Sequence, residues 1–134
     1  MIGLLLRVGA LAWLLGVQPL DLALTASRVA FRPVPLAWPA LLALAIRVVA
    51  VGVGVAAGLS LLRRTPSART LARAWIVLEL GTLALVWTTD AWPSNRPPGG
   101  RWPVAVVYAL GAAMVGLAAR VQPAGGLPTS LRSR

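Results

Sequence analysis

Long hydrophobic runs alternate along the chain with short segments rich in arginine, proline and glycine. Four runs are about 20 residues long, which is the length that a helix needs to cross a hydrocarbon layer roughly 30 Å thick. The pattern predicts helices over residues 2–25, 37–62, 71–92 and 102–121, followed by a polar tail over 122–134. We therefore expect a single-domain, all-α integral membrane protein built as a bundle of four transmembrane helices.

The first hydrophobic run has an alternative interpretation as a secretory signal peptide, because residues 23–27 could form a cleavage region. A retained helix is favoured, since no basic residue precedes the run and Arg7 interrupts it. Pro19 lacks a backbone donor and is expected to bend this helix, which leaves Asp21 near its far interface. Three prolines then predict a connector over residues 26–39 that lies along the interface.

Composition supports the membrane assignment and excludes most catalytic chemistry. Hydrophobic residues make up 58% of the chain, charged residues only 12%, and the mean hydropathy is +0.80. Cysteine and histidine are absent, and only three carboxylates occur. This excludes disulfides, thiolate nucleophiles and metal or haem ligation by histidine within this chain. We expect no enzyme activity, no metal site and no cofactor, since no nucleophile and base are arranged together.

The formal net charge of +10 comes from arginine alone, because the chain has no lysine. These arginines flank the hydrophobic runs, which favours contacts with anionic lipid headgroups over nucleic acid binding. With four spans, seven arginines fall on the face that carries both termini and four on the other face. The larger group is Arg63, Arg64, Arg69, Arg73, Arg120, Arg132 and Arg134, and the smaller is Arg28, Arg32, Arg96 and Arg101. The positive-inside rule predicts an N-in/C-in topology in a bacterial-type cytoplasmic membrane.

Small residues at four-residue spacing predict close helix packing. They are Ala50, Gly54 and Gly58 in the second segment, and Ala112 and Gly116 in the fourth. Such faces let a neighbouring helix approach closely, either from this chain or from a partner subunit. The glycine-rich stretch around Gly54 does not have the spacing or the flanking residues of a phosphate-binding loop.

Tryptophans near the ends of the predicted spans are expected to anchor the helices at the membrane interfaces. These interface anchors are Trp38, Trp75, Trp87, Trp92 and Trp102.

Two charges lie deep within predicted spans. Glu79 is about 12 Å along its helix and Arg47 about 15 Å along the preceding one, so both are near the middle of the membrane. An unpaired charge at that depth costs about 2.5–3.5 kcal/mol on insertion scales. The connecting link offsets them by roughly 7 Å, which an extended arginine can cover. We predict that Arg47 and Glu79 form an intramembrane charge pair; Arg7 and Asp21 are alternative partners, and Asp90 is a further charged candidate.

The pair has three possible roles. In the first, the pair is structural: the two charges neutralise each other and fix the helix register. In the second, Glu79 binds a proton or cation, and Arg47 adjusts the pKa of Glu79. In the third, one of the two charges pairs with a partner subunit. The leading expectation is a non-catalytic accessory or structural subunit of a larger membrane complex, in contact with other membrane subunits. The alternative is a small proton- or cation-coupled transporter or channel oligomer that uses Glu79. No motif in the sequence ties the chain to a particular family.

Overall fold

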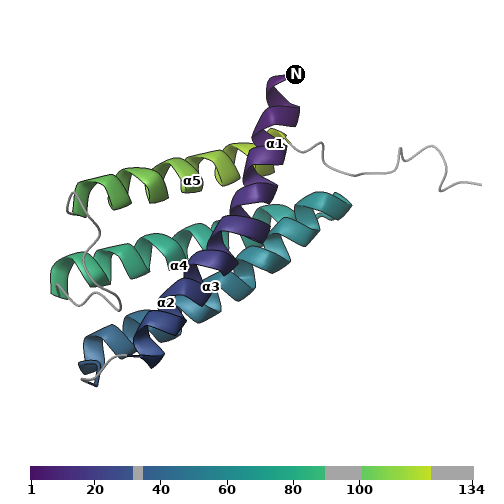
Figure 1. Cartoon of the computed structure of the whole chain (residues 1–134). Helices are drawn as coiled ribbons and strands as arrows, with labels where there is room; N and C mark the ends of the chain where they lie inside the picture. Colours follow the sequence, from purple (N-terminus) through teal and green to yellow (C-terminus); the bar gives the residue numbers. More distant parts are fainter. Residues whose placement is uncertain (32–34, 90–100, 122–134) are drawn as a thin grey trace, which may run out of the picture.

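The computed structural model describes residues 1–31, 35–89 and 101–121, and all regular elements within these ranges are helical (Figure 1). They are α1 (Ile2–Ala12), the π-helical turn η1 (Trp13–Val17), α2 (Gln18–Ala30), α3 (Trp38–Arg63), α4 (Ala68–Thr89) and α5 (Arg101–Val121). Because α1, η1 and α2 are continuous, the described residues form four long helices, each long and apolar enough to cross a membrane. The predicted all-α class and the four predicted helices are confirmed.

The first helix is longer than predicted because it continues through Pro19. The N–H of Gln18 donates to the carbonyl of Trp13, five residues earlier, and this makes one wide turn before the proline. That wide turn accommodates the proline ring, which would otherwise crowd the carbonyl of Leu15. The helix then runs to Ala30, 29 residues from its start, so the predicted connector begins later than residue 26.

The α3–α4 hairpin has a regular buried seam. Seven of the nine buried positions in α3 recur at alternating intervals of three and four residues, and the six in α4 do the same; Val51 and Gly58 are buried beside the seam. The α3 positions are Ala40, Ala43, Arg47, Ala50, Gly54, Ala57 and Leu61; the α4 positions are Ala68, Ala72, Trp75, Glu79, Thr82 and Val86. The seam is rich in alanine, so the two helices can lie close together, and both predicted intramembrane charges are part of it.

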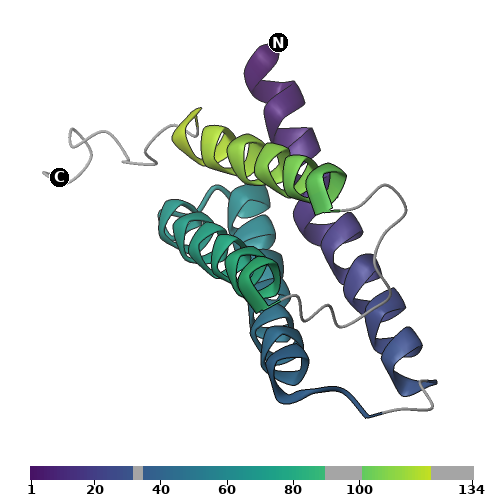
Figure 2. The ribbon, with the colours of Figure 1, turned by 90° about the vertical axis from the view of Figure 1, so that its left-hand side faces the viewer.

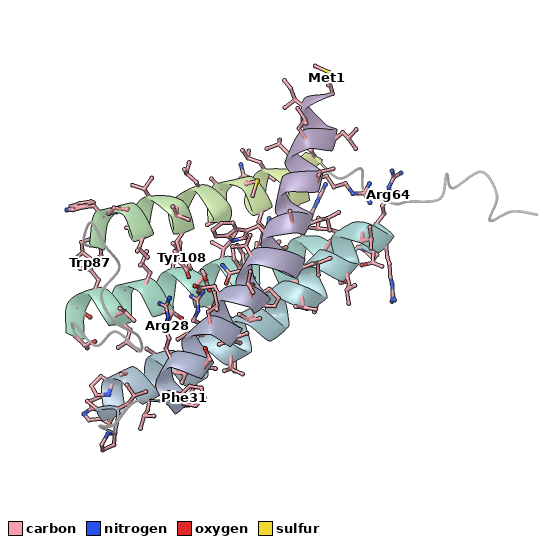
Figure 3. All side chains as sticks on the ribbon, in the orientation of Figure 1. Met1, Arg28, Phe31, Arg64, Trp87 and Tyr108 are labelled. Carbon is pink, nitrogen blue, oxygen red and sulfur yellow. The ribbon has the colours of Figure 1, made fainter. Side chains whose placement is uncertain are left out.

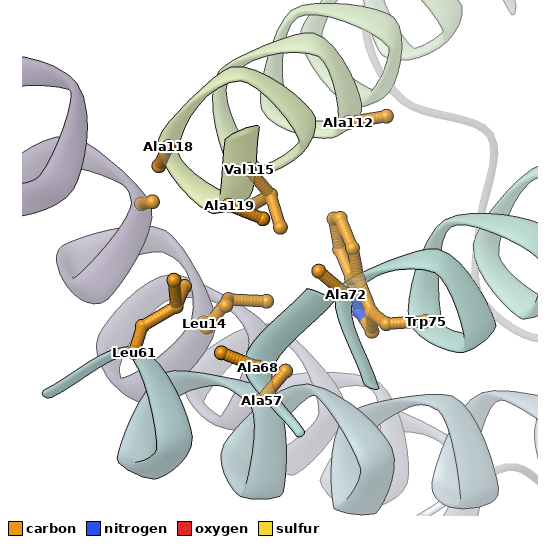
Figure 4. Close-up of a cluster of buried hydrophobic side chains, with 11 residues drawn as sticks. Leu14, Ala57, Leu61, Ala68, Ala72, Trp75, Ala112, Val115, Ala118 and Ala119 are labelled. Carbon is orange, nitrogen blue, oxygen red and sulfur yellow. The ribbon is translucent and has the colours of Figure 1, made fainter. Parts of the chain in front are cut away.

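Helix α5 lies beside α4 and crosses α1, whereas α2 packs on α3 (Figure 2). The hydrophobic core forms where α1, η1, α3, α4 and α5 meet (Figure 4). Its largest fully buried apolar side chains are Trp75, Leu14, Leu61 and Val115, and alanines fill most of the remaining positions. The first long helix is therefore held in two parts, with α1 against α5 and α2 against α3.

The link between α3 and α4 is a compact turn. Arg64 is left-handed, with φ of 56°, and the N–H of Thr65 donates to the carbonyl of Ser60 at 3.0 Å. A non-glycine residue in this conformation costs roughly 1–2 kcal/mol. We call this region, where α3 and α5 end and α4 begins, the link end of the bundle.

Two arginines cap helix C-termini at the link end. Arg7 from α1 donates to the carbonyls of Leu61 and Leu62 at 2.9 Å each. Arg69 from α4 donates to the carbonyl of Ala119 in α5 at 3.2 Å. The last carbonyls of a helix have no partner within it, and cations stabilise that end, so these contacts join the four long helices at one end.

Candidate functional site

Each of the four long helices contributes at least one polar side chain to a single cluster inside the bundle. Gln18 and Asp21 come from α2, Arg47 from α3, Glu79 from α4 and Tyr108 from α5. Figure 3 shows Tyr108 directed from α5 into the space between the helices. We call these five residues the polar cluster; the predicted Arg47–Glu79 contact is part of it.

Arg47 is the centre of the cluster. Its Nη1 lies 3.3 Å from Oε1 of Glu79, and its Nη2 lies 2.5 Å from Oδ2 of Asp21. The same Nη2 lies 3.4 Å from Oε1 of Gln18 and donates to the hydroxyl of Tyr108, and the guanidinium carbon is 5.0 Å from the centre of the Tyr108 ring. Asp21 therefore has the shorter ion pair, and Glu79 shares the same guanidinium at a longer distance.

Glu79 is the most deeply buried charged group of the cluster. It is 1% exposed, as is Gln18, whose Nε2 donates to Oε1 of Glu79 at 3.0 Å. The second carboxylate oxygen, Oε2, is buried and has no hydrogen-bond partner among the described residues. The Asp21 side chain differs, since it is 47% exposed on the flank of the bundle. The cluster thus has a closed end at Glu79 and an open end at Asp21.

The charges of the cluster do not balance. Two carboxylates, Asp21 and Glu79, share the single guanidinium of Arg47, and the other two members are neutral. With both carboxylates ionised the cluster carries one net negative charge in a largely buried place. Burying an uncompensated charge costs several kcal/mol, of order 3–5, so an added proton or monovalent cation would stabilise this arrangement.

Tyr108 is positioned by an aromatic contact. Its ring meets Trp13 of η1 edge to face, with centroids 6.1 Å apart and planes at 85°. Trp13 in turn lies directly on Gly111, where a Cβ atom would be 2.6 Å from Cζ2 of the indole. The absence of a side chain at Gly111 therefore allows the contact through which η1 supports Tyr108.

We predict that Gly111→Ala destabilises the protein by about 1–3 kcal/mol, because the new methyl overlaps a rigid ring. Its matched control is Gly81→Ala in α4, where a Cβ meets nothing within 4 Å and helix propensity favours alanine by up to about 1 kcal/mol. Unfolding in mixed detergent micelles measures both variants. Equal stability of Gly111→Ala and Gly81→Ala would contradict the assigned contact.

The predicted small residues pack within the chain. A Cβ at Gly54 would lie 2.9 Å from Cδ1 of Trp75, and one at Gly58 would lie 2.7 Å from Cδ2 of Leu15. Ala50 is fully buried and Ala112 is 7% exposed. A Cβ at Gly116 would be 3.5 Å from Cδ1 of Ile76. Neighbouring helices of the same chain therefore occupy these small-residue faces.

The tryptophans predicted as interface anchors are not all exposed near helix ends. Trp75 is fully buried in the core against Gly54, so its prediction as an interface anchor is wrong; it falls on the regular seam of α4. Trp38 and Trp102 are 72% and 73% exposed near the starts of their helices. Trp87 meets Trp102 edge to face with centroids 5.3 Å apart. Trp92 lies outside the described residues.

The secondary charged candidates also have different positions. Asp21 is in the polar cluster rather than near the end of its helix, because α2 continues for nine residues beyond it to Ala30. Arg7 caps α3 at the link end, where it donates to the carbonyls of Leu61 and Leu62 rather than to a carboxylate of the polar cluster. Asp90 lies outside the described residues.

Gln18 and Tyr108 were not predicted as site residues. Both are large hydrogen-bonding side chains inside apolar runs, and Tyr108 is the only tyrosine in the chain. That isolation in an apolar segment is the signal that could have identified them, since buried polar groups in such segments require partners.

Among the described residues no three carboxylate, histidine or cysteine side chains are grouped as metal ligands would be. The site is an ion-paired polar cluster whose five members are joined by hydrogen bonds. Comparison with known protein families, with curated proteins and with solved structures finds no match for this chain.

Proposed function

We propose that this chain is a small integral membrane protein that binds a proton, or a monovalent cation in its place, at Glu79 and couples this binding to transport across the membrane. The observation that carries the proposal is the buried Oε2 of Glu79, which lacks a partner in a cluster that has two carboxylates and one guanidinium. A proton or cation at Glu79 would remove the excess charge.

The depth of the cluster supports this function. Glu79 lies 11 residues from the start of α4 and 10 from its end, so it is about 17 Å from the start and about 15 Å from the end. This is the middle of a hydrocarbon layer roughly 30 Å thick. Ionisable groups at that depth are costly and commonly belong to ion or proton pathways. The half-exposed Asp21 gives the cluster an open side on the flank of the bundle.

We propose the orientation in which the link end faces the cytoplasm, with the N-terminus on the same side, in a bacterial-type cytoplasmic membrane. Support comes from the exposed arginines of the link end, including Arg63 and Arg73. The C-terminal end of α5 is also at the link end, through the contact of Arg69 with Ala119.

The proposal is tested by reconstituting the purified chain in liposomes that contain a pH-sensitive dye. We expect proton flux with the wild type and flux at the level of empty liposomes with Glu79→Gln. The variant keeps the size of the side chain and leaves Arg47 paired with Asp21, so the bundle is expected to remain folded. Unchanged flux with Glu79→Gln would overturn the assignment of Glu79.

A carbodiimide that reacts with protonated carboxyl groups in apolar surroundings gives a second readout. We expect labelling at Glu79, measured by mass spectrometry of the intact chain, and its loss in Glu79→Gln. Protection by sodium ions at constant pH would identify a cation site, whereas protection only at higher pH would identify a proton site. Labelling that persists in Glu79→Gln would contradict the proposal.

The second candidate function is the accessory subunit of a larger membrane complex. The observation that favours it is the half-exposed carboxylate of Asp21 on the flank of the bundle, where a basic side chain of a partner helix could pair with it. The small-residue faces no longer support a partner, since helices of this chain occupy them. Native mass spectrometry after gentle solubilisation separates the two functions: bound heterologous subunits favour the accessory role.

A further inference from the structure

The link end carries a group of exposed arginines from three separate segments of the chain. They are Arg63 and Arg64 at the end of α3, Arg73 in α4 and Arg120 in α5. The described acidic residues, Asp21 and Glu79, belong to the polar cluster and do not neutralise these arginines. The link end is therefore strongly positive, and it complements a negatively charged ligand.

Two capping contacts hold these segments together. Arg7 donates to the carbonyls of Leu61 and Leu62 beside the turn, and Arg69 donates to the carbonyl of Ala119, next to Arg120. Arg7 and Arg69 thus hold the helix ends that carry the other arginines at one end of the bundle. The charge there is organised by tertiary contacts and is not merely a property of flanking sequence.

The backbone conformation of Arg64 gives separate support for a binding site at the link end. Among the described residues it is the only non-glycine residue with positive φ. Glycine or asparagine normally occupies this position after a helix, because a Cβ atom is disfavoured there. Retained backbone strain at an exposed position indicates a use for the side chain. Figure 3 shows Arg64 at the end of the bundle away from Phe31, with its side chain extending from the ribbon.

We propose that the link end is a binding site for the phosphate group of anionic phospholipids, with Arg64 as its central ligand and Arg63, Arg73 and Arg120 around it. Guanidinium groups bind phosphate oxygens through paired, charge-assisted hydrogen bonds. The link joins two helices long and apolar enough to cross a membrane, which places it at headgroup depth when they do. The site rests on membrane insertion and is independent of ion binding at Glu79.

The test compares lipid binding by the wild type and by Arg64→Gly in native mass spectrometry from detergent micelles. Glycine adopts the required φ without strain, so the fold is expected to be at least as stable as the wild type. We expect phosphatidylglycerol to bind the wild type in preference to phosphatidylcholine. Loss of one arginine is expected to weaken phosphatidylglycerol binding about fivefold.

Two control variants isolate the effect. Arg64→Asn also tolerates positive φ and is expected to match Arg64→Gly. Arg28→Gln removes the same charge near the end of α2, away from the link end, and is expected to bind phosphatidylglycerol like the wild type. If Arg28→Gln and Arg64→Gly weaken phosphatidylglycerol binding equally, net charge alone explains the effect, and the proposed site is overturned. Displacement of the lipid by millimolar inorganic phosphate would also overturn it, as would equal binding of phosphatidylcholine.

Discussion

Replacing Arg47 with leucine is expected to destabilise the protein by about 3–5 kcal/mol, because it leaves Asp21 and Glu79 without the cation that they share. The change also removes the donor for Gln18 and Tyr108, so four side chains lose a contact at once. Equilibrium unfolding in mixed detergent micelles, followed by far-ultraviolet circular dichroism, measures the loss. A cost below about 1 kcal/mol, the range of a solvated surface pair, would contradict the central position of Arg47.

A double variant separates charge from packing. Arg47→Leu combined with Asp21→Asn removes the shorter ion pair as a unit and leaves Glu79 as the only remaining carboxylate of the cluster. We expect the double variant to be more stable than Arg47→Leu alone, with a coupling energy of about 0.5–3 kcal/mol in the double-mutant cycle. Additive losses would show that Arg47 and Asp21 act separately.

Truncating Trp75 to alanine is expected to cost about 3–5 kcal/mol, because it is the largest fully buried side chain of the core. Its indole fills the space that Gly54 leaves in α3, and the cavity would lie between α3, α4 and α5. The same unfolding measurement tests this. A small loss, comparable with that of truncating the exposed Trp38, would place Trp75 at a lipid-facing surface after all.

Trp75→Phe is the matched control for size. The indole Nε1 of Trp75 is buried without a hydrogen-bond partner among the described residues, so phenylalanine loses ring volume but no hydrogen bond. We expect it to be destabilised by roughly half of the alanine variant or less. A loss as large as that of Trp75→Ala would point to an unrecognised partner of Nε1.

The number of helices and their approximate bounds follow from hydrophobic length, which is a strong signal for spans of about 20 residues. The contact between Arg47 and Glu79 follows from simple counting, because a short link makes α3 and α4 antiparallel neighbours. The contribution of Asp21 could not be counted in the same way, since it depends on how far α2 extends. The prolines in the sequence predicted a helix end that is too early. The helix continues because the wide turn at η1 accommodates Pro19.

The position of Trp75 shows a different limit. Tryptophan near a helix end usually marks an interface, but the seam of α4 repeats at three- and four-residue intervals and includes Trp75. The spacing of buried positions along α4 therefore predicts the burial of Trp75 better than its residue type does. Neither residue type nor spacing predicts the position of Tyr108, because its place in the cluster depends on how α5 packs against the first helix.

The wide turn at η1 sets the rotational phase of α2 relative to α1. A π-helical turn holds one residue more than an α-helical turn, so it takes up one residue with little rotation of the helix that follows. If the same residues formed an ordinary α-helical turn, everything after them would rotate by about 100°. Gln18 and Asp21 would then face away from Arg47, while the contacts between α1 and α5 could persist. The polar cluster therefore depends on the wide turn itself, which keeps the two halves of the first long helix in the phase that their different neighbours require.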